Sequence, residues 1–325
     1  MSLTIVMYHY VRELENSRYS KIKGLTVEQF KEQIAYIKKF YNPISACDLM
    51  DSMCADAELP PRAILLTFDD GYIDHFTNVF PILEKEQISG CFFPPAKCIL
   101  EECVLDVNKI HFALACTPDK NALVEHIFRE LDRHRHQYDL EANAEYWERC
   151  GRESRFDTAE VIFVKRMLQK ELPGTLRKLF ADELFRRFVS RDEREFAREL
   201  YMSREQVTCL QASNMYVGSH GYEHCWLDSV PNDAQRKDVE LSLEFLESVG
   251  SSTMRWIMCY PYGAYNRSLL TLLRERKCVA GLTTVVGIVD EIRAADPLLL
   301  PRLDTNDLPK AANAEISEWT AKAGQ

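Results

Sequence analysis

The chain has 325 residues, of which 46% are hydrophobic and 28% are charged. This composition predicts a globular protein with enough length for one large core or two smaller ones, and it excludes a disordered chain. The formal charge of −10, from 50 acidic and 40 basic residues, excludes the basic footprint of a nucleic-acid-binding protein.

Apolar runs and cysteines indicate the compartment. Every apolar run is far shorter than the roughly 20 residues that span a bilayer, and the N-terminus enters a strand-like pattern without the basic segment of a secretory signal. The eleven cysteines are scattered and contain no C-x-x-C pair, which argues against a disulfide framework and a zinc ribbon. We therefore expect a cytoplasmic protein without a transmembrane segment, which could associate peripherally with the inner face of the membrane.

The first hundred residues alternate strand and helix signals. Strand-like runs occupy residues 3–8, 63–68 and 91–93, and helical signals occupy residues 26–41 and 74–85. The first helix opens with the capping box Thr26-x-x-Gln29. Because the second strand is apolar on both faces, this alternation predicts a parallel sheet built from βαβ units.

Residues 104–206 lack the alternating strand and helix signals, and their apolar residues recur at helical spacing. The clearest series is Leu176, Phe180, Leu184 and Phe188. We interpret this stretch as an all-helical insertion that acts as a lid, an oligomer surface or a substrate-specificity subdomain. Residues 1–103 and 207–325 then form a single catalytic domain.

The alternation of strands and helices resumes after the insertion. Strand signals at 215–217, 256–259 and 279–284 and the apolar run 298–300 alternate with helical signals at 232–249 and 266–277. This many alternations predict an α/β fold with a barrel-like or open parallel sheet. Catalytic groups of such folds lie at the carboxyl ends of the strands.

Two adjacent carboxylates, Asp69 and Asp70, follow the predicted strand 63–68. Neighbouring carboxylates repel each other and destabilise a fold unless a cation or a proton lies close to them. An Asp-Gly turn that caps a helix explains the same residues equally well.

Two histidines, His220 and His224, follow the strand at 215–217. On a helical turn, imidazoles four residues apart face the same way and could bind one divalent ion together with a nearby carboxylate. A histidine pair on a surface helix is the equally plausible alternative. The segment also fits the H-x-x-E-H pattern of zinc peptidases with Glu223 as general base, although Gly221 disfavours the long helix that this pattern needs.

Two further strand ends carry polar groups. The segment Tyr260-Pro261-Tyr262-Gly263 follows the strand at 256–259, and its backbone N–H groups could point at an oxyanion. His9 ends the first strand. An isolated histidine of this kind is usually a hydrogen-bonded core residue, so it matters only if the other segments converge with it.

Taken together, these segments resemble the polysaccharide deacetylases of the NodB-homology type, which are similar to carbohydrate esterase family 4 and remove N-acyl groups from amino sugars. The resemblance rests on residues 67–71, 219–224, 260–263 and 300–302. Their order and spacing agree with the family over residues 1–103 and 207–305, about two thirds of the chain. The resemblance implies a distorted (β/α) barrel, with the helical insertion not covered.

The family resemblance assigns roles to individual residues. It implies that Asp70, His220 and His224 bind a catalytic divalent metal, with Zn²⁺ the first expectation and Co²⁺, Ni²⁺ or Fe²⁺ also compatible with these ligands. Asp69 is then the general base that activates water, and the backbone N–H of Tyr262 helps to hold the oxyanion.

The sequence departs from the family at two positions. Cys259 stands where the family has an arginine, and the late Leu-x-His that supplies the general acid is absent, since Leu282 is followed by two threonines. The chain resembles the permuted exopolysaccharide deacetylases in its N-terminal Tyr-His, which makes His9 the candidate acid. Arg302 is the candidate to replace the lost arginine and to orient Asp69.

We therefore expect a metal-dependent hydrolase that removes an acetyl or formyl group from an amino sugar in the biosynthesis of surface-polysaccharide or glycolipid precursors. The substrate would be nucleotide-linked or lipid-linked, and the enzyme could form a homo-oligomer. The residues expected to contact substrate are Asp106, Asn108, Lys109 and Tyr260. A non-catalytic carbohydrate-binding protein is the alternative, although such a protein has no need of the complete set formed by metal ligands and a base.

Overall fold

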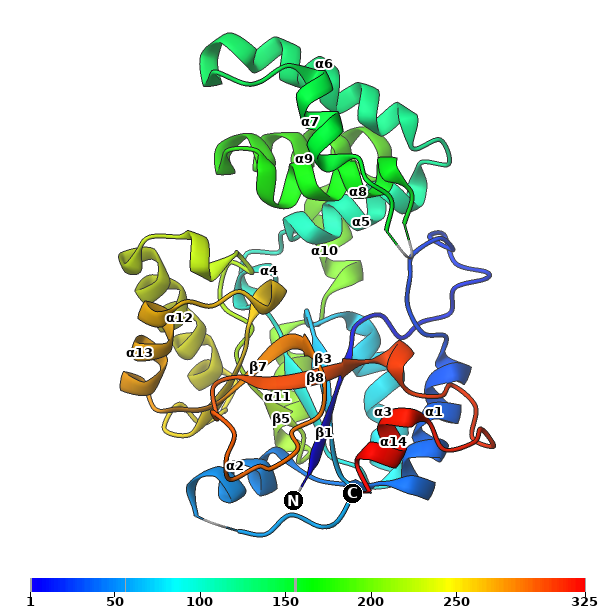
Figure 1. Ribbon diagram of the computed structural model, residues 1–325, viewed down its shortest axis with the longest axis vertical. Helices are drawn as coiled ribbons and strands as arrows, with labels where there is room; N and C mark the ends of the chain where they lie inside the picture. The colour runs from blue at the N-terminus through cyan, green and yellow to red at the C-terminus, as the bar shows by residue number, and fades with distance from the viewer. Residues whose placement is uncertain (1, 56, 155–156, 325) are drawn as a thin grey trace. The chain divides into compact units, whose positions relative to one another are not determined.

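The structure is a computed structural model that describes residues 2–55, 57–154 and 157–324 (Figure 1). The chain forms two compact units. The first, which we call the barrel unit, comprises Met1–Glu13, Gly24–Glu102 and Arg198–Gln325. The second, the helical unit, comprises Leu14–Lys23 and Cys103–Ala197. The residue ranges predicted for the two domains were 1–103 with 207–325, and 104–206.

The barrel unit is organised around an eight-stranded sheet in which every strand pairing is parallel. Its strands are β1 (Leu3–Tyr8), β2 (Asn42–Pro43), β3 (Ala63–Asp69), β4 (Gly90–Phe93), β5 (Tyr216–Val217), β6 (Trp256–Cys259), β7 (Cys278–Val286) and β8 (Leu300–Asp304). They pair in the order β5-β4-β3-β1-β8-β7-β6, and β2 pairs with β3. The prediction of a parallel α/β fold is confirmed.

The two ends of the sheet meet at one point. Ser219, just after β5, donates its backbone N–H to Ile257 O at 3.1 Å and accepts from Cys259 N at 2.8 Å, which forms a parallel bridge with Met258. This bridge joins β5 to β6 and curls the sheet into a distorted barrel. It also brings the segment that carries both site histidines beside the carboxyl end of β6.

Alternate residues of the central strands enter two separate cores. Ile64 and Leu66 of β3 pack with residues of helix α1, whereas Ala63 and Leu65 pack with side chains from β1, β4, β6, β7 and β8. Successive side chains of a strand point to opposite faces, so the second core fills the barrel interior. The prediction that this strand is buried on both faces is confirmed.

Helices surround the sheet of the barrel unit. They are α1 (Val27–Phe40), α2 (Ala46–Cys54), a π-helical turn (His75–Val79), α3 (Phe80–Glu86), α4 (Ala96–Leu100), α11 (Arg204–Ala212), α12 (Asn232–Ser248), α13 (Arg267–Glu275) and α14 (Glu318–Lys322). In Figure 1, α12 and α13 lie on one side of the strands and α1, α3 and α14 lie on the other. The predicted capping box of α1 is confirmed, since the Thr26 hydroxyl accepts from Gln29 N and the Gln29 side chain accepts from Thr26 N.

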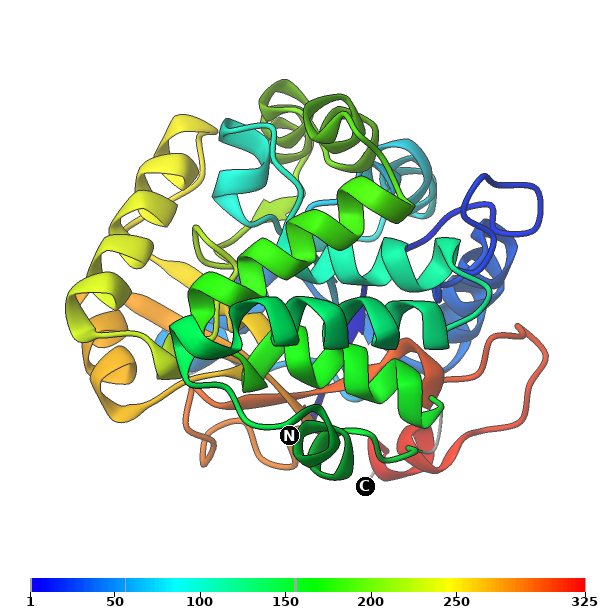
Figure 2. The same cartoon turned by 90° about the horizontal axis from the view of Figure 1, so that it is seen from above.

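The helical unit has its own apolar core. Its helices are α5 (Asp106–Cys116), α6 (Asn121–Tyr138), α7 (Asn143–Cys150), α8 (Ala159–Arg166) with a π-helical extension (Met167–Glu171), α9 (Gly174–Phe188) and α10 (Glu193–Leu200), which crosses the boundary with the barrel unit. Leu176, Phe180 and Leu184 are wholly buried in it, as their spacing predicted. Figure 2 shows the green helices of this unit side by side.

One segment of the helical unit comes from far away in the sequence. Residues 14–23 join it, and the ring of Tyr19 meets the edge of Phe112 with a centroid distance of 4.9 Å. Within the described residues, no helix has the length and apolar character that crossing a membrane requires.

Candidate active site

The predicted catalytic residues of the barrel unit lie at the carboxyl ends of its strands. Asp69 ends β3, Asp70 follows it, and His9 follows β1. His220 and His224 lie in the loop after β5, and Arg302 lies on β8. The fold therefore brings together residues that are up to three hundred positions apart in sequence.

Three side chains converge on one point. Oδ1 of Asp70 lies 3.4 Å from Nε2 of His220 and 3.2 Å from Nε2 of His224. All three side chains are buried, with at most 8% of any residue exposed. One carboxylate and two imidazoles in this arrangement can hold a divalent metal ion and leave further positions for water and substrate.

The partners of these groups fit a metal ligand set. Nδ1 of His220 lies 2.7 Å from Cys259 O and donates to it, so Nε2, which faces Asp70, is the ring nitrogen available as a ligand atom. The Tyr72 hydroxyl donates to Oδ2 of Asp70 at 2.6 Å. Oδ1 of Asp70 is buried without a hydrogen-bond partner among the described residues, and a buried acceptor left in this way is costly unless a cation or water completes it.

The charge of Asp70 also favours a bound cation. Burial would raise the pKa of its carboxyl group, but the adjacent imidazoles of His220 and His224 outweigh burial and hold that pKa well below its ordinary value. Asp70 is therefore ionised at neutral pH and attracts positive charge to the point where the two imidazoles meet.

The two histidines converge through a loop, and the expected helical turn is wrong. Gly221 has φ +70° and His224 has φ 52°, both in the left-handed region, where a regular helix cannot continue. The Asp238 carboxylate accepts from Tyr222 N at 2.9 Å and from Glu223 N at 2.8 Å, which satisfies the loop backbone. A Cβ on Gly221 would lie 2.9 Å from the same carboxylate, so the glycine makes room for this bond.

The zinc peptidase hypothesis is wrong for the same reason. The pattern requires both histidines and the glutamate on one regular helix. Glu223 instead extends away from the ligand set and pairs with Lys97 at 2.6 Å, with half of its side chain exposed.

Asp69 is held inside the barrel by Arg302, through one hydrogen bond and one ion-pair contact. Arg302 approaches both of its oxygens, with Nη1 3.0 Å from Oδ1 and Nη2 2.8 Å from Oδ2. The same guanidinium donates to Thr67 Oγ1 and to Thr283 O, so its orientation is fixed. Burial raises the pKa of Asp69, but the charges of Arg302 and His220 outweigh burial and lower it, which keeps this carboxylate ionised.

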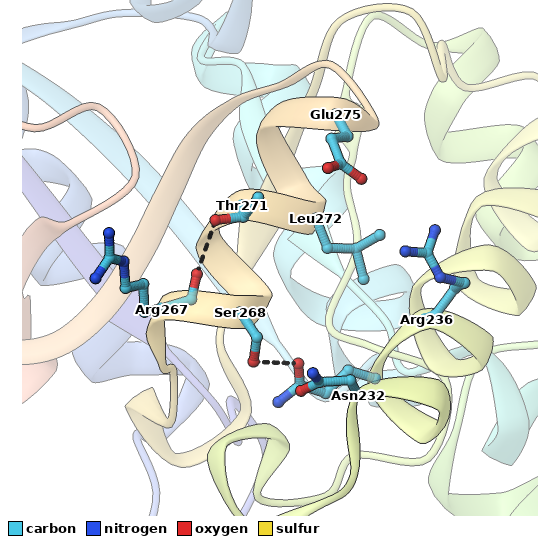
Figure 3. A pocket seen from close by; sticks show the side chains of 8 residues that line it. Asn232, Arg236, Arg267, Ser268, Thr271, Leu272 and Glu275 are labelled. Atoms are coloured by element: carbon cyan, nitrogen blue, oxygen red, sulfur yellow. Dashed lines mark hydrogen bonds between the residues drawn. The ribbon is translucent and has the colours of Figure 1, made fainter.

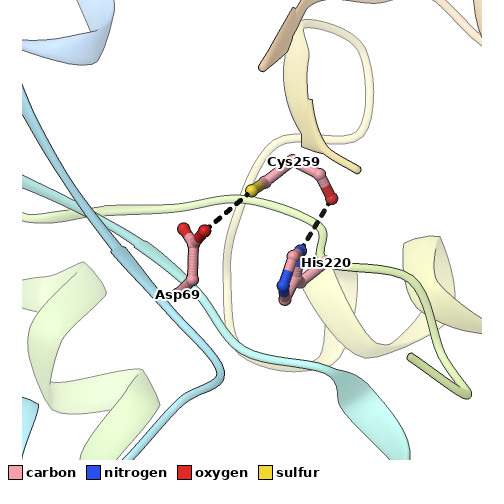
Figure 4. Close-up of side chains that lie close together, drawn as sticks. All are labelled: Asp69, His220 and Cys259. Atoms are coloured by element: carbon pink, nitrogen blue, oxygen red, sulfur yellow. Dashed lines mark hydrogen bonds between the residues drawn. The ribbon is translucent and has the colours of Figure 1, made fainter. Parts of the chain in front are cut away.

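Cys259 connects Asp69 to the candidate ligand residue His220. Its thiol donates to Oδ2 of Asp69 at 3.3 Å, while its carbonyl accepts from His220 (Figure 4). The thiol lies wholly inside the protein, and burial raises its pKa, so it stays protonated and serves as the donor. The residue that departs from the family pattern thus contacts both halves of the site.

His9 lies near both carboxylates. Its interaction with Asp69 and Asp70 is the smallest of those that lower the pKa of these carboxyl groups, after Arg302 and His220 at Asp69 and after His220 and His224 at Asp70. The backbone carbonyl of His9 accepts a hydrogen bond from His75 Nε2 at 2.9 Å. Burial lowers the pKa of His75 to about 4, so this imidazole is neutral and donates. The buried His75 therefore anchors the chain where His9 leaves the sheet.

Tyr262 lies against the metal-ligand set. Its ring packs at 65° to that of His224 with a centroid distance of 4.9 Å and stacks on Trp226 at 4.6 Å. Its φ of 58° is left-handed, as are those of Asp70 and His224. Backbone strain of this kind in non-glycine residues concentrates at functional sites.

The residues expected to contact substrate have other partners. Tyr260 is wholly buried and donates its hydroxyl to Leu298 O at 3.0 Å, so its side chain is a core group. Asp106, Asn108 and Lys109 lie on α5 of the helical unit, where Asn108 is buried and Lys109 forms ion pairs with Asp182 and Glu193. Substrate contact by these residues stays a prediction.

Sequence reasoning missed Tyr72, His75 and Trp226 as parts of this site. Tyr72 has a signal in retrospect, because it follows the Asp-Asp-Gly turn directly, whereas His75 is an isolated histidine with no spacing that marks it. The structure also contains a cavity of about 460 Å³ between α12 and α13, and none of the predicted catalytic residues lines it (Figure 3).

A curled parallel sheet with carboxylates and imidazoles gathered at the carboxyl ends of its strands defines the molecule as an α/β-barrel protein with a candidate metal site. Comparison with known sequences makes the class specific. The sequence model of the polysaccharide deacetylase family matches residues 56–137 and 188–280, together more than half of the chain. The chain belongs to the polysaccharide deacetylase family.

Individual relatives agree with this assignment. Over 91 residues the chain is 31% identical to the poly-beta-1,6-N-acetyl-D-glucosamine N-deacetylase of Escherichia coli K12, a match that covers 27% of this chain and 13% of that protein. The fold is similar to that of the Streptococcus pyogenes deacetylase PplD (TM-score 0.60, 14% identity, 100% of this chain and 99% of the other). It is also similar to IcaB from Ammonifex degensii (TM-score 0.57, 18% identity, 100% and 97%).

Proposed function

We propose that this protein is a metal-dependent N-deacylase that hydrolyses the acetamido or formamido group of an amino sugar. The observation that carries the proposal is the convergence of Asp70, His220 and His224 beside an ionised Asp69. A carbohydrate-binding protein would need neither the ligand set nor a carboxylate held ready to accept a proton.

A divalent metal fits the residues present. Asp70, His220 and His224 would hold it, and borderline-soft Zn²⁺ suits one carboxylate with two imidazoles, as do Co²⁺, Ni²⁺ and Fe²⁺. When bound, such an ion polarises an amide carbonyl and makes water easier to deprotonate.

The protein's own groups supply the proton transfers. Asp69 accepts a proton from the attacking water while Arg302 keeps its carboxylate in place, and the new C–O bond forms at the acyl carbon. The backbone N–H of Tyr262 stabilises the oxyanion. His9 donates a proton to the sugar nitrogen as the C–N bond breaks, because an amine cannot leave as an anion. The products are a carboxylate and a free amino sugar.

Two substrate classes follow from different observations. The similarity to the E. coli N-deacetylase, whose name specifies poly-beta-1,6-N-acetyl-D-glucosamine, favours a β-1,6-linked N-acetylhexosamine chain. The sequence favours a nucleotide-linked or lipid-linked precursor. A role of the helical unit in substrate selection, through Asp106, Asn108 and Lys109, belongs to the proposal, as do a cytoplasmic location and a homo-oligomeric state.

The test is release of acetate or formate by the purified chain supplied with Zn²⁺ or Co²⁺. The panel contains UDP-linked and lipid-linked acylamino sugars and β-1,6-linked N-acetylglucosamine oligosaccharides, with an Asp69→Asn variant as the matched control. We expect release from one class, and none from the control. Sugar binding without release from any member would contradict the deacylase proposal and favour the carbohydrate-binding alternative.

A further inference from the structure

The helical unit contains a second group of potential metal ligands, separate from the barrel unit. His126 and Glu130 lie one turn apart on α6, and Glu183 lies on the neighbouring α9. One ligand atom from each of the three residues lies within 4.8 Å of the other two. Residues four positions apart face the same side of a helix, so both α6 side chains can reach a single ion.

His126 is buried without a partner for its ring. Only 6% of the residue is exposed, and among the described residues neither of its nitrogens has a hydrogen-bond partner. Its Nε2 lies 3.9 Å from Oε2 of Glu183, which is too far for a hydrogen bond, and that carboxylate oxygen is also buried without one. Two facing polar groups that are buried and do not bond each other leave a space that a cation would satisfy.

The charges around the group are compatible with a cation. Two carboxylates balance a divalent ion, and Arg133 donates to Oε2 of Glu130 at 2.8 Å, which leaves the other oxygen of that carboxylate for a metal.

We propose that His126, Glu130 and Glu183 form a second metal site, which takes a divalent transition-metal ion and ties α6 to α9. One nitrogen and two carboxylate oxygens suit Zn²⁺ or Mn²⁺, and the absence of a sulfur ligand among the three disfavours Cu⁺. With three protein ligands, water completes the coordination. The site is structural, since it would fix two helices of the unit, and it does not depend on the proposed deacylase activity.

The experiment counts bound metal. The full chain is stripped with chelator, equilibrated with Zn²⁺ or Mn²⁺, separated from free ion and analysed for metal per chain. We expect His126→Ala to bind one equivalent less than the wild type. His136→Ala, which removes an exposed histidine from the same helix, is the matched control and should bind as much as the wild type.

A second pair of variants keeps the test independent of the catalytic site and of folding defects. In a His220→Ala background, which removes a barrel-unit ligand, the remaining equivalent should disappear when His126→Ala is added.

Glu183→Gln keeps the shape of a partly exposed side chain. We expect it to weaken metal binding at least tenfold. In the His220→Ala background it should also abolish the rise in melting temperature that metal produces. Unchanged stoichiometry and affinity in His126→Ala and Glu183→Gln would overturn the proposal, as would an equal loss in His136→Ala. Because no assay of sugar hydrolysis enters, failure of the deacylase proposal leaves this result unaffected.

Discussion

Arg302 contacts both carboxylate oxygens of Asp69, with Nη1 3.0 Å from Oδ1 and Nη2 2.8 Å from Oδ2. Both side chains are buried. Their strands β8 and β3 do not pair, because β1 lies between them. Arg302 is therefore a positioning residue, since the orientation of the proposed base depends on a side chain two strands away.

Arg302→Ala should damage both stability and activity. It leaves a carboxylate buried without its counter-ion, which costs about 3–5 kcal/mol in the free energy of unfolding, and it releases the orientation of Asp69, which costs on the order of 10²-fold in kcat/KM. Arg302→Lys keeps the charge without the fork and should lie between the two. Urea unfolding and acetate release measure these effects. Wild-type kcat/KM in Arg302→Ala would show that Asp69 needs no such partner.

Substitution of the proposed base and substitution of a proposed metal ligand should have different effects on turnover and on metal binding. Asp69→Asn removes the proton acceptor but none of the three ligand side chains, so turnover should fall below detection while one equivalent of metal still binds at the barrel site. His220→Ala should lose both activity and that equivalent. Metal analysis beside single-turnover assays distinguishes the two variants. Normal activity in metal-loaded His220→Ala would remove the basis for the assigned ligand set.

Substitutions at Cys259 and Arg302 should have non-additive effects on the free energy of unfolding, because both side chains contact Asp69. Cys259→Ser keeps a donor to Asp69 and should retain activity within a few-fold. Cys259→Arg brings a second guanidinium against the buried Arg302 and should destabilise the protein by about 3 kcal/mol or more. Combining Cys259→Arg with Arg302→Leu should recover part of that stability, and a double-mutant cycle of unfolding free energies measures the coupling. Additive effects in the cycle would mean that the two positions do not share Asp69.

His9 as general acid predicts a dependence on the leaving group. His9→Ala should reduce kcat for N-acetyl amino sugars by about 10²–10⁴-fold, because the departing amine needs a proton. Hydrolysis of 4-nitrophenyl acetate, whose leaving group departs as an anion, should fall only a few-fold. Asp69→Asn should lose both activities, which makes it the control. An equal loss on both substrates in His9→Ala would assign His9 to another role.

The positions of the candidate catalytic residues could be predicted from sequence where these residues end apolar strands. Asp69, Asp70 and His9 each follow a strand whose pattern is clear, so the barrel topology alone brings them to one edge. The spacing of the two histidines led to a wrong prediction, because the conformation of the backbone between them decides how their side chains meet. His220 and His224 meet through left-handed loop residues rather than a helix, and periodicity carries no information about such a loop.

Side-chain partners, whether close together or far apart in the chain, were the other part that sequence could not define. The bond between Tyr72 and Asp70 follows from a left-handed backbone at Asp70, and the packing of residues 14–23 in the helical unit follows from the path of the chain. Tyrosine is a residue type that often binds ligands, and Tyr260 was therefore expected to contact substrate. It follows β6 directly, however, and its side chain packs in the apolar core. Family resemblance supplied Arg302 as a partner for Asp69, and only the assembled sheet brings the two within hydrogen-bond distance.

The buried His75 should make stability depend on pH. Its pKa is lowered by burial to about 4 in the folded chain, against about 6.5 when it is exposed in the unfolded chain. Between these values the unfolded chain binds the extra proton, so the contribution of neutral His75 is present above pH 6.5 and is lost as the pH falls toward 4. Linkage sets the loss at about 2 kcal/mol between pH 7 and pH 5. His75→Asn keeps a donor for His9 O without a titrating group, so its unfolding free energy should lack this component. Parallel urea titrations of both proteins at pH 7, 6 and 5 measure the difference, and identical pH slopes would mean that the pKa of His75 is the same in the folded and the unfolded chain.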